Sequence, residues 1–133
     1  MTARDMTYQV IRTLEARGIE LDYASAEALR RAELTLRRWA EGECGNGNDY
    51  ASWSIERDEE TGKPYLCTYP HQGKSRRTAI ADRERGALKR IAALCQTHGL
   101  HYYHQTDPRG CALYVSKEPL TDTNYSNGAA CSA

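Results

Sequence analysis

The chain has 133 residues, with 18 basic and 18 acidic side chains and a formal net charge of zero. That length suits one domain built around a single core. The neutral total argues against a uniformly basic nucleic-acid binder and against an acidic nucleic-acid mimic. The mean hydropathy is −0.75, and no window approaches the roughly 18 apolar residues of a membrane span. Because the first ten residues also lack the apolar stretch of a signal peptide, we expect a cytoplasmic protein with no membrane partner.

Two helices open the predicted fold. Apolar side chains recur at helical spacing over residues 4–17, and Gly18 is a suitable stop. Ser25 is the expected N-cap of the second helix, which ends at Gly42. One face of this helix is apolar and the other is basic, with Leu29, Ala32, Leu36 and Trp39 against Arg30, Arg31, Arg37 and Arg38.

Two β-hairpins follow. Residues 51–56 alternate apolar and polar side chains, and Gly62 closes a turn that returns the chain through residues 65–69. The second hairpin pairs residues 100–105 with residues 111–116 across an Asp-Pro-Arg-Gly turn, in which the glycine takes the position that needs a positive φ.

A third helix is predicted between the hairpins. Asp82 is its expected cap, Leu88, Ile91 and Cys95 share one face, and the helix ends near Gly99. The order α-α-β-β-α-β-β predicts an α+β fold with a four-stranded antiparallel sheet packed on helices.

We expect one domain over residues 1–118. The polar residues 119–133 are then a flexible C-terminal tail.

The zero net charge conceals two oppositely charged segments. Residues 41–60 hold seven acids against Arg57 alone, a net charge of −6, whereas residues 74–90 hold seven bases against two acids, a net charge of +5. These surfaces can steer two different partners or attract each other within the fold. The basic side chains suit contacts with phosphates, and are Lys74, Arg76, Arg77, Arg83, Arg85, Lys89 and Arg90.

Tyrosines on the second hairpin are the remaining binding candidates. If the aliphatic side chains face the core, Tyr114 and either Tyr102 or Tyr103 are exposed. Exposed tyrosine beside arginine suits base stacking or a protein hot spot, while ordinary cross-strand pairing is the alternative. On the acidic side, the candidate partner contacts are Glu56, Asp58 and Glu59.

The cysteines and histidines predict neither a metal site nor a disulfide framework. Five cysteines without a C-x-x-C motif point to reduced thiols, and Cys67, Cys95 and Cys111 are expected in the core. Cys95 is spaced like a zinc ligand relative to three histidines, but His101 and His104 alternate on a strand, so the set does not converge easily.

Catalytic sites have no specific signature in the sequence. A Cys111 nucleophile with His101 or His104, and a metal-holding cluster of Glu56, Asp58 and Asp107, remain alternatives without a diagnostic spacing. We therefore predict no catalytic residue and no cofactor.

Four blocks of sequence carry a resemblance to a protein family. They are residues 43–48 (ECGNGN), 55–64 (IERDEETGKP), 82–88 (DRERGAL) and 103–110 (YHQTDPRG). Together they resemble small proteins of bacterial phages, prophages and other mobile elements, over roughly residues 29–116. The resemblance implies a protein that regulates phage genes or disables a host defence such as a CRISPR complex, and it implies no catalytic residue.

These observations predict a non-enzymatic binding protein. Its expected partner is a host protein or nucleoprotein complex that it inhibits or modulates, in the manner of an anti-CRISPR or other anti-defence protein. The alternative is direct nucleic-acid binding through the basic segment, with Tyr103 or Tyr114 stacking on bases.

Overall fold

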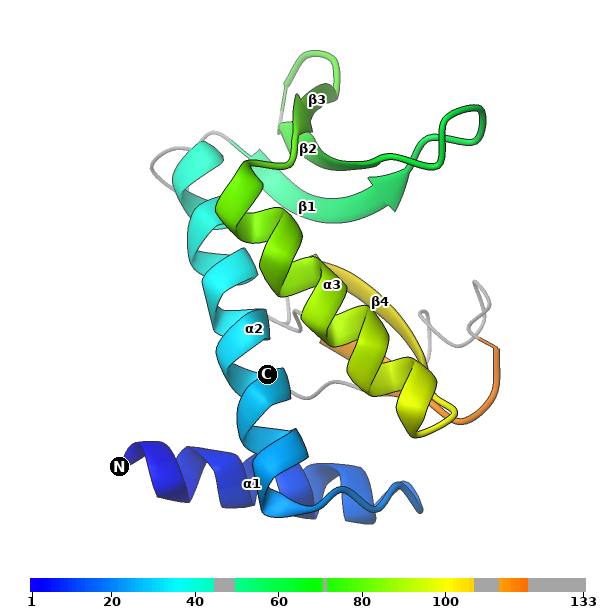
Figure 1. Ribbon diagram of the computed structural model, residues 1–133. Coiled ribbons are helices and arrows are strands. Elements are labelled where there is room, and N and C mark those ends of the chain that lie inside the picture. The colour runs from blue at the N-terminus through cyan, green and yellow to red at the C-terminus, as the bar shows by residue number, and fades with distance from the viewer. Residues whose placement is uncertain (45–49, 71, 107–112, 120–133) are drawn as a thin grey trace.

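The computed structural model describes residues 1–44, 50–70, 72–106 and 113–119 (Figure 1). Within these residues the elements follow in the order α1 (Ala3–Glu15), α2 (Tyr23–Glu43), β1 (Tyr50–Arg57), β2 (Pro64–Pro70), β3 (Arg76–Ala79), α3 (Asp82–Thr97), β4 (His101–Thr106) and β5 (Leu113–Ser116). The expected α+β class is confirmed. No helix in this part of the chain has both the length and the apolar character needed to cross a membrane.

The sheet has five strands where four were predicted, in the order β3-β2-β1-β4-β5. Every neighbouring pair is antiparallel, and the two hairpins join through β1 and β4, where Ile55 lies opposite His104. The additional strand is β3, which pairs Arg77 with Cys67. It was missed because its two arginines look like a charged loop, whereas exposed basic side chains are common on the edge strand of a sheet.

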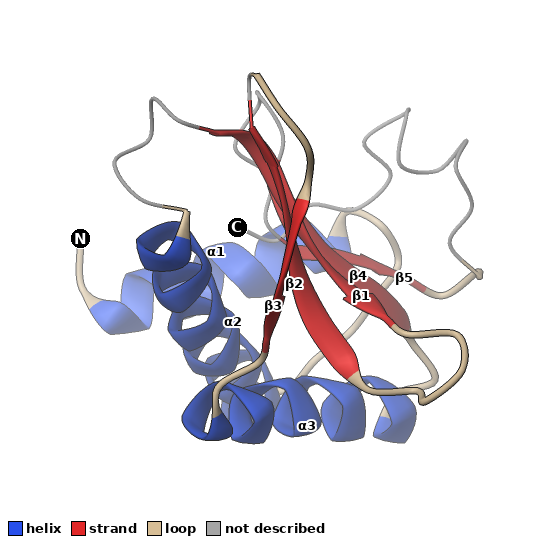
Figure 2. Cartoon of the chain, turned by 90° about the horizontal axis from the view of Figure 1, so that it is seen from above, coloured by secondary structure: helices blue, strands red, loops and turns tan. Residues whose placement is uncertain are grey.

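The helices cover one face of this sheet (Figure 2). Trp53, Leu66 and Leu113 project from three strands into the same core cluster as Leu36 of α2 and Ile91 of α3. α1 packs against α2 at the end where α2 begins (Figure 1). The predicted apolar faces of the second and third helices are therefore the buried ones, with Trp39 only partly buried at the edge of the core.

Helix starts differ from the prediction, because the cap residues lie outside the apolar pattern. Asp22, not Ser25, caps α2, and its carboxylate accepts the Ser25 backbone N–H at 3.1 Å. Asp82 is the first residue of α3 rather than its cap, which is Ala81 with no side-chain hydrogen bond. Two of the three predicted glycine stops, Gly18 and Gly99, adopt positive φ just after their helices. The third, Gly42, lies within α2, which ends at Glu43.

The first hairpin has the predicted turn, with Gly62 at a φ of 72°. Two of the three expected core cysteines, Cys67 and Cys95, are buried. The third, Cys111, lies outside the described residues, as do the predicted turn at 107–110 and almost all of the predicted tail.

Candidate functional site

The basic segment of the sequence divides between two places in the fold. Arg76 and Arg77 lie on the edge strand β3 and contact the acidic segment of the chain. The Arg77 guanidinium stacks 4.5 Å from the centre of the Tyr65 ring and lies 3.9 Å from the Asp58 carboxylate. Arg76 donates a hydrogen bond of 2.7 Å to the backbone carbonyl of Glu43. Here the oppositely charged segments attract each other within the fold.

The remaining arginines of the segment lie on α3. Arg85 pairs with Asp82 one turn earlier in the helix. Arg83, Lys89 and Arg90 are exposed, and none of them makes an ion pair with a described carboxylate. Lys74 is also exposed, in the loop before β3. The free positive charge of the segment is therefore concentrated on α3.

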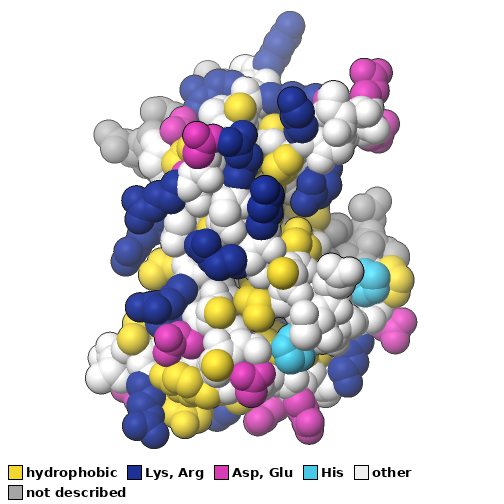
Figure 3. All heavy atoms as spheres, in the orientation of Figure 1, with side chains coloured by type: hydrophobic (Ala, Val, Ile, Leu, Met, Phe, Trp, Pro, Cys, Tyr) yellow, Lys and Arg dark blue, Asp and Glu magenta, His cyan; other side chains and the backbone are white. Residues whose placement is uncertain are grey.

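Arg83 meets the basic side of α2 in a groove between the two helices, which we call the α2–α3 groove. Its volume is about 510 Å³, and its lining residues are Arg30, Arg31, Leu34, Thr35, Arg38, Trp39, Arg83 and Glu84. Basic side chains gather on this face of the molecule (Figure 3). Four guanidiniums, three from α2 and one from α3, thus share one concave surface with a tryptophan.

The arginines of the groove differ in how firmly they are held. Arg30 donates from Nε to the hydroxyl of Thr7 at 3.0 Å, which fixes its stem between α1 and α2. Arg31 lies 3.7 Å from the Glu27 carboxylate in an exposed pair, which contributes little attraction in water. Arg38 and Arg83 have no ion pair with any described carboxylate. Two positive charges in the groove are therefore available to an anionic ligand.

Sequence reasoning assigned the α2 arginines to the solvent side of a helix and did not include them in a site. The spacing of Arg31 and Arg38 on α2 was visible in the sequence. The sequence held no signal that Arg83 would lie beside them, because that contact depends on how α3 crosses α2.

The predicted tyrosines lie on the other face of the sheet. Tyr103 is half-buried, and its hydroxyl donates a hydrogen bond to the Glu56 carboxylate. The same carboxylate accepts a second hydrogen bond, of 2.9 Å, from the Ser54 hydroxyl. Tyr114 is fully buried, so the expected exposed tyrosine on the last strand is wrong. Side-chain alternation fixes which face a residue occupies but not whether other parts of the protein cover it.

The predicted acidic contacts lie beside these tyrosines and in the first hairpin turn. Asp58 accepts backbone N–H groups of Glu60 and Thr61 at 2.9 and 3.0 Å, and these hydrogen bonds lower the pKa of its carboxyl. Glu59 is exposed at the turn. Glu56 and Asp58 are thus engaged within the hairpin and its neighbours, and the α2–α3 groove contains neither.

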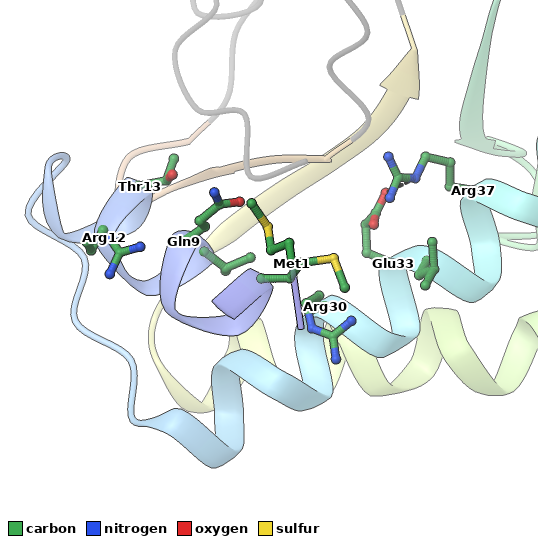
Figure 4. A pocket seen from close by; sticks show the side chains of 10 residues that line it. Met1, Gln9, Arg12, Thr13, Arg30, Glu33 and Arg37 are labelled. Carbon is green, nitrogen blue, oxygen red and sulfur yellow. Dashed lines mark ion pairs between the residues drawn. The ribbon is translucent and has the colours of Figure 1, made fainter. Parts of the chain in front are cut away.

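A second hollow of about 500 Å³ lies between α1 and α2. Figure 4 shows Glu33 beside Arg37 in its wall, with Met1 extending into it. The Glu33 carboxylate lies 3.2 Å from Arg37 Nε and 3.6 Å from His104 Nε2. His104 also meets the Trp53 ring edge-on at 4.9 Å. This hollow therefore has a buried acid–imidazole pair behind its wall.

The histidines and cysteine with metal-like spacing do not come together. Cys95 and His104 are buried, whereas His101 is exposed. His98 lies at the end of α3, with its Nε2 atom 3.4 Å from the hydroxyl of Ser25 in α2. Among the described residues, no group of three or more His, Cys, Asp or Glu side chains could hold a metal ion.

Two of the described thiols are also poorly suited to nucleophilic chemistry. Burial raises the pKa of both Cys44 and Cys95 to about 11, so both thiols are protonated at neutral pH. The alternatives that used Cys111 or Asp107 lie outside the described residues.

Comparison of the chain with protein-family models, with curated proteins and with solved structures finds no match. The geometry of the α2–α3 groove therefore carries the functional argument.

Proposed function

We propose that this chain binds single-stranded nucleic acid without turnover, through the α2–α3 groove. The observation that carries the proposal is the set of four arginines from two helices in one groove, two of them without an ion pair in the described chain. Arginine guanidiniums bind phosphate oxygens in bidentate geometry and supply most of the affinity for a phosphate backbone.

Trp39 favours a single strand over a duplex. Its indole is partly exposed and lines the groove beside Arg38. Base–aromatic stacking contributes about 1–3 kcal/mol per base, and it requires a base that is not already stacked in a helix. Proteins that bind single strands commonly combine such a ring with a basic groove.

The predicted role in a mobile element fits this site. A protein that inhibits or modulates a host nucleoprotein complex meets exposed nucleic acid there, and an arginine groove gives it affinity for that component. Host-complex inhibition stays the prediction of the resemblance, while the groove supplies the argument for nucleic-acid contact.

The test is the salt dependence of binding to a fluorescent dT12 oligonucleotide, followed by anisotropy. Each phosphate contact on a single strand contributes about 0.7 to the slope of log K against log salt concentration. We expect the double variant Arg38→Gln/Arg83→Gln to bind about tenfold more weakly than the wild type and to lower that slope by roughly 1.4.

The matched control is Lys63→Gln/Lys117→Gln, which removes the same number of charges from exposed positions outside the groove. It should leave the slope near the wild-type value. Equal slopes for the two double variants would show that the groove does not bind the backbone.

A further inference from the structure

The hollow between α1 and α2 adjoins the α2–α3 groove, and we call it the α1–α2 hollow. Its volume is about 500 Å³, close to that of the groove. Arg30 and Leu34 line the hollow as well as the groove, and both residues are half-buried. The same stretch of α2 therefore forms a wall of each concavity, and the two are neighbours on the surface of the molecule.

The arginines of α2 form two rows that line these two concavities. Arg30 and Arg37 line the hollow, and Arg31 and Arg38 line the groove. The members of each row are seven residues apart, which places them nearly two turns apart on one side of the helix, about 10 Å along its axis. The second row follows the first by one residue and is turned by about 100° around the helix. Guanidiniums spaced in this way suit a chain of phosphates better than one small anion.

Two arginines of the hollow are held in place through their Nε atoms. Arg30 donates from Nε to the Thr7 hydroxyl at 3.0 Å, and Arg37 Nε lies 3.2 Å from the Glu33 carboxylate. Neither contact uses the terminal Nη atoms, which are hydrogen-bond donors in every arginine. A side chain that is already ordered loses less conformational entropy on binding. Both guanidiniums are therefore prepared to donate to a phosphate.

The hollow is basic in spite of the acid in its wall. Arg12 on α1, with Arg30 and Arg37 on α2, lines it (Figure 4). Glu33 is the acid among the described lining residues, which together carry a net charge of +2. The Glu33 side chain is buried against Arg37, whereas Arg12 is exposed and makes no ion pair with a described carboxylate. The hollow therefore attracts anions, as the groove beside it does.

We infer that a single strand bound in the α2–α3 groove continues across Arg30 and Leu34 into the α1–α2 hollow, where Arg12 and Arg37 contact its phosphates. This inference rests on the proposed function of the groove and extends the binding surface to a second concavity. A strand too short to reach both concavities then makes only part of the contacts.

The experiment compares fluorescent dT4 with dT12 by anisotropy over a series of salt concentrations. The slope of log K against log salt concentration counts phosphate contacts, at about 0.7 for each contact on a single strand. Unlike the affinity, this slope does not depend on how many positions a long strand offers for binding. We expect the slope for dT12 to exceed that for dT4 by roughly 1.4 or more, which corresponds to two further phosphate contacts.

A charge change on the α1 wall assigns these further contacts to the hollow. Gln9→Glu/Thr13→Glu adds two carboxylates at exposed positions that line the hollow, and it leaves the pair of Glu33 and Arg37 in place. The variant should lower the slope for dT12 by roughly 1.4 and weaken binding of dT12 about tenfold. It should change the affinity for dT4 less than twofold.

The matched control makes the same two changes on α3. Gln96→Glu/Thr97→Glu adds two carboxylates at exposed positions that line neither concavity. It should keep the slope for dT12 near the wild-type value, with circular dichroism confirming that both variants are folded.

The outcomes separate this inference from the proposed function. Equal slopes for dT12 in the hollow variant and its control would overturn the inference, while the effect of Arg38→Gln/Arg83→Gln would leave groove binding intact. A hollow variant that loses binding to a 12-residue glutamate peptide, with its dT12 slope unchanged, would assign the hollow to an acidic protein segment and also overturn the inference. If the wild type binds neither strand, both proposals are wrong.

Discussion

At the residue scale, His104 is a chargeable ring in the core of the protein. It is 1% exposed, and its nearest charged groups are Glu33 and, through that carboxylate, Arg37. Among the described residues, neither ring nitrogen has a hydrogen-bond partner. Desolvation by burial therefore lowers the pKa of His104 below its usual value of 6.5, although Glu33 acts in the opposite direction.

This depressed pKa predicts a loss of stability in mild acid. Above pH 6.5 the imidazole is neutral in both the folded and the unfolded chain, and no stability is lost. As the pH falls below 6.5, the unfolded chain takes up a proton that the folded chain resists. The free energy of unfolding should therefore fall by up to about 1.4 kcal/mol per pH unit, as measured by urea denaturation between pH 7.5 and 5.

Two variants isolate the contribution of His104. His104→Leu removes the buried titrating ring, so its stability profile should be flatter than that of the wild type over this range. His101→Gln removes an exposed histidine of the same strand and should keep the wild-type profile. Parallel profiles for the wild type and His104→Leu would contradict the prediction.

At the element scale, the sequence predicted the interiors of the helices and strands better than their ends. Apolar periodicity located the buried faces of α2 and α3, because burial repeats with the helix turn. The cap of α2 was missed by three residues, because Asp22 and Ser25 are both good caps and only the backbone path distinguishes them. The short strand β3 was missed altogether, since two of its four residues are arginines.

The turn of the first hairpin and the end of α2 offer a matched pair of glycine substitutions. Gly62→Ala should lower the free energy of unfolding by about 1–2 kcal/mol, because its φ of 72° is unfavourable for a residue with a Cβ. Gly42→Ala lies in a helix with open space around the new methyl group. It should raise the stability by up to about 1 kcal/mol.

Urea denaturation of the two glycine variants beside the wild type measures both effects. A Gly62→Ala variant as stable as the wild type would show that the turn relaxes into another conformation.

At the scale of the whole molecule, the sheet separates Arg83 from Tyr103, which the sequence grouped in one predicted site. The arginines of the α2–α3 groove belong to the helix layer, which covers one face of the sheet (Figure 2). Tyr103 and Glu56 contact each other on the other face, because side chains alternate along β1 and β4 and the neighbouring Ile55 and His104 face the core. A single strand bound in the groove, as we propose, would therefore not stack on Tyr103. In the proposed binding mode, base stacking would fall to Trp39, which was predicted only as a core residue.

This separation predicts unequal effects for two pairs of arginines. Arg76→Gln/Arg77→Gln removes side chains that already contact Glu43, Tyr65 and Asp58, and it should change the affinity for dT12 less than twofold. Arg38→Gln/Arg83→Gln carries the same charge change and should weaken binding about tenfold. The measurement is again anisotropy at fixed salt. A larger loss from the β3 pair would place the binding surface on the edge strand.

The sequence by itself determined the α+β class, the buried faces of the helices and the position of the first hairpin, because these depend on local periodicity and turn chemistry. It also located two oppositely charged segments in a chain whose formal net charge is zero. Only the tertiary structure decided what those charges do. Pairing of β3 with β2 brings Arg77 beside Asp58, while the packing of α3 on α2 brings Arg83 beside Arg38. Both contacts join residues distant in the chain, and local sequence patterns hold no information about such distances.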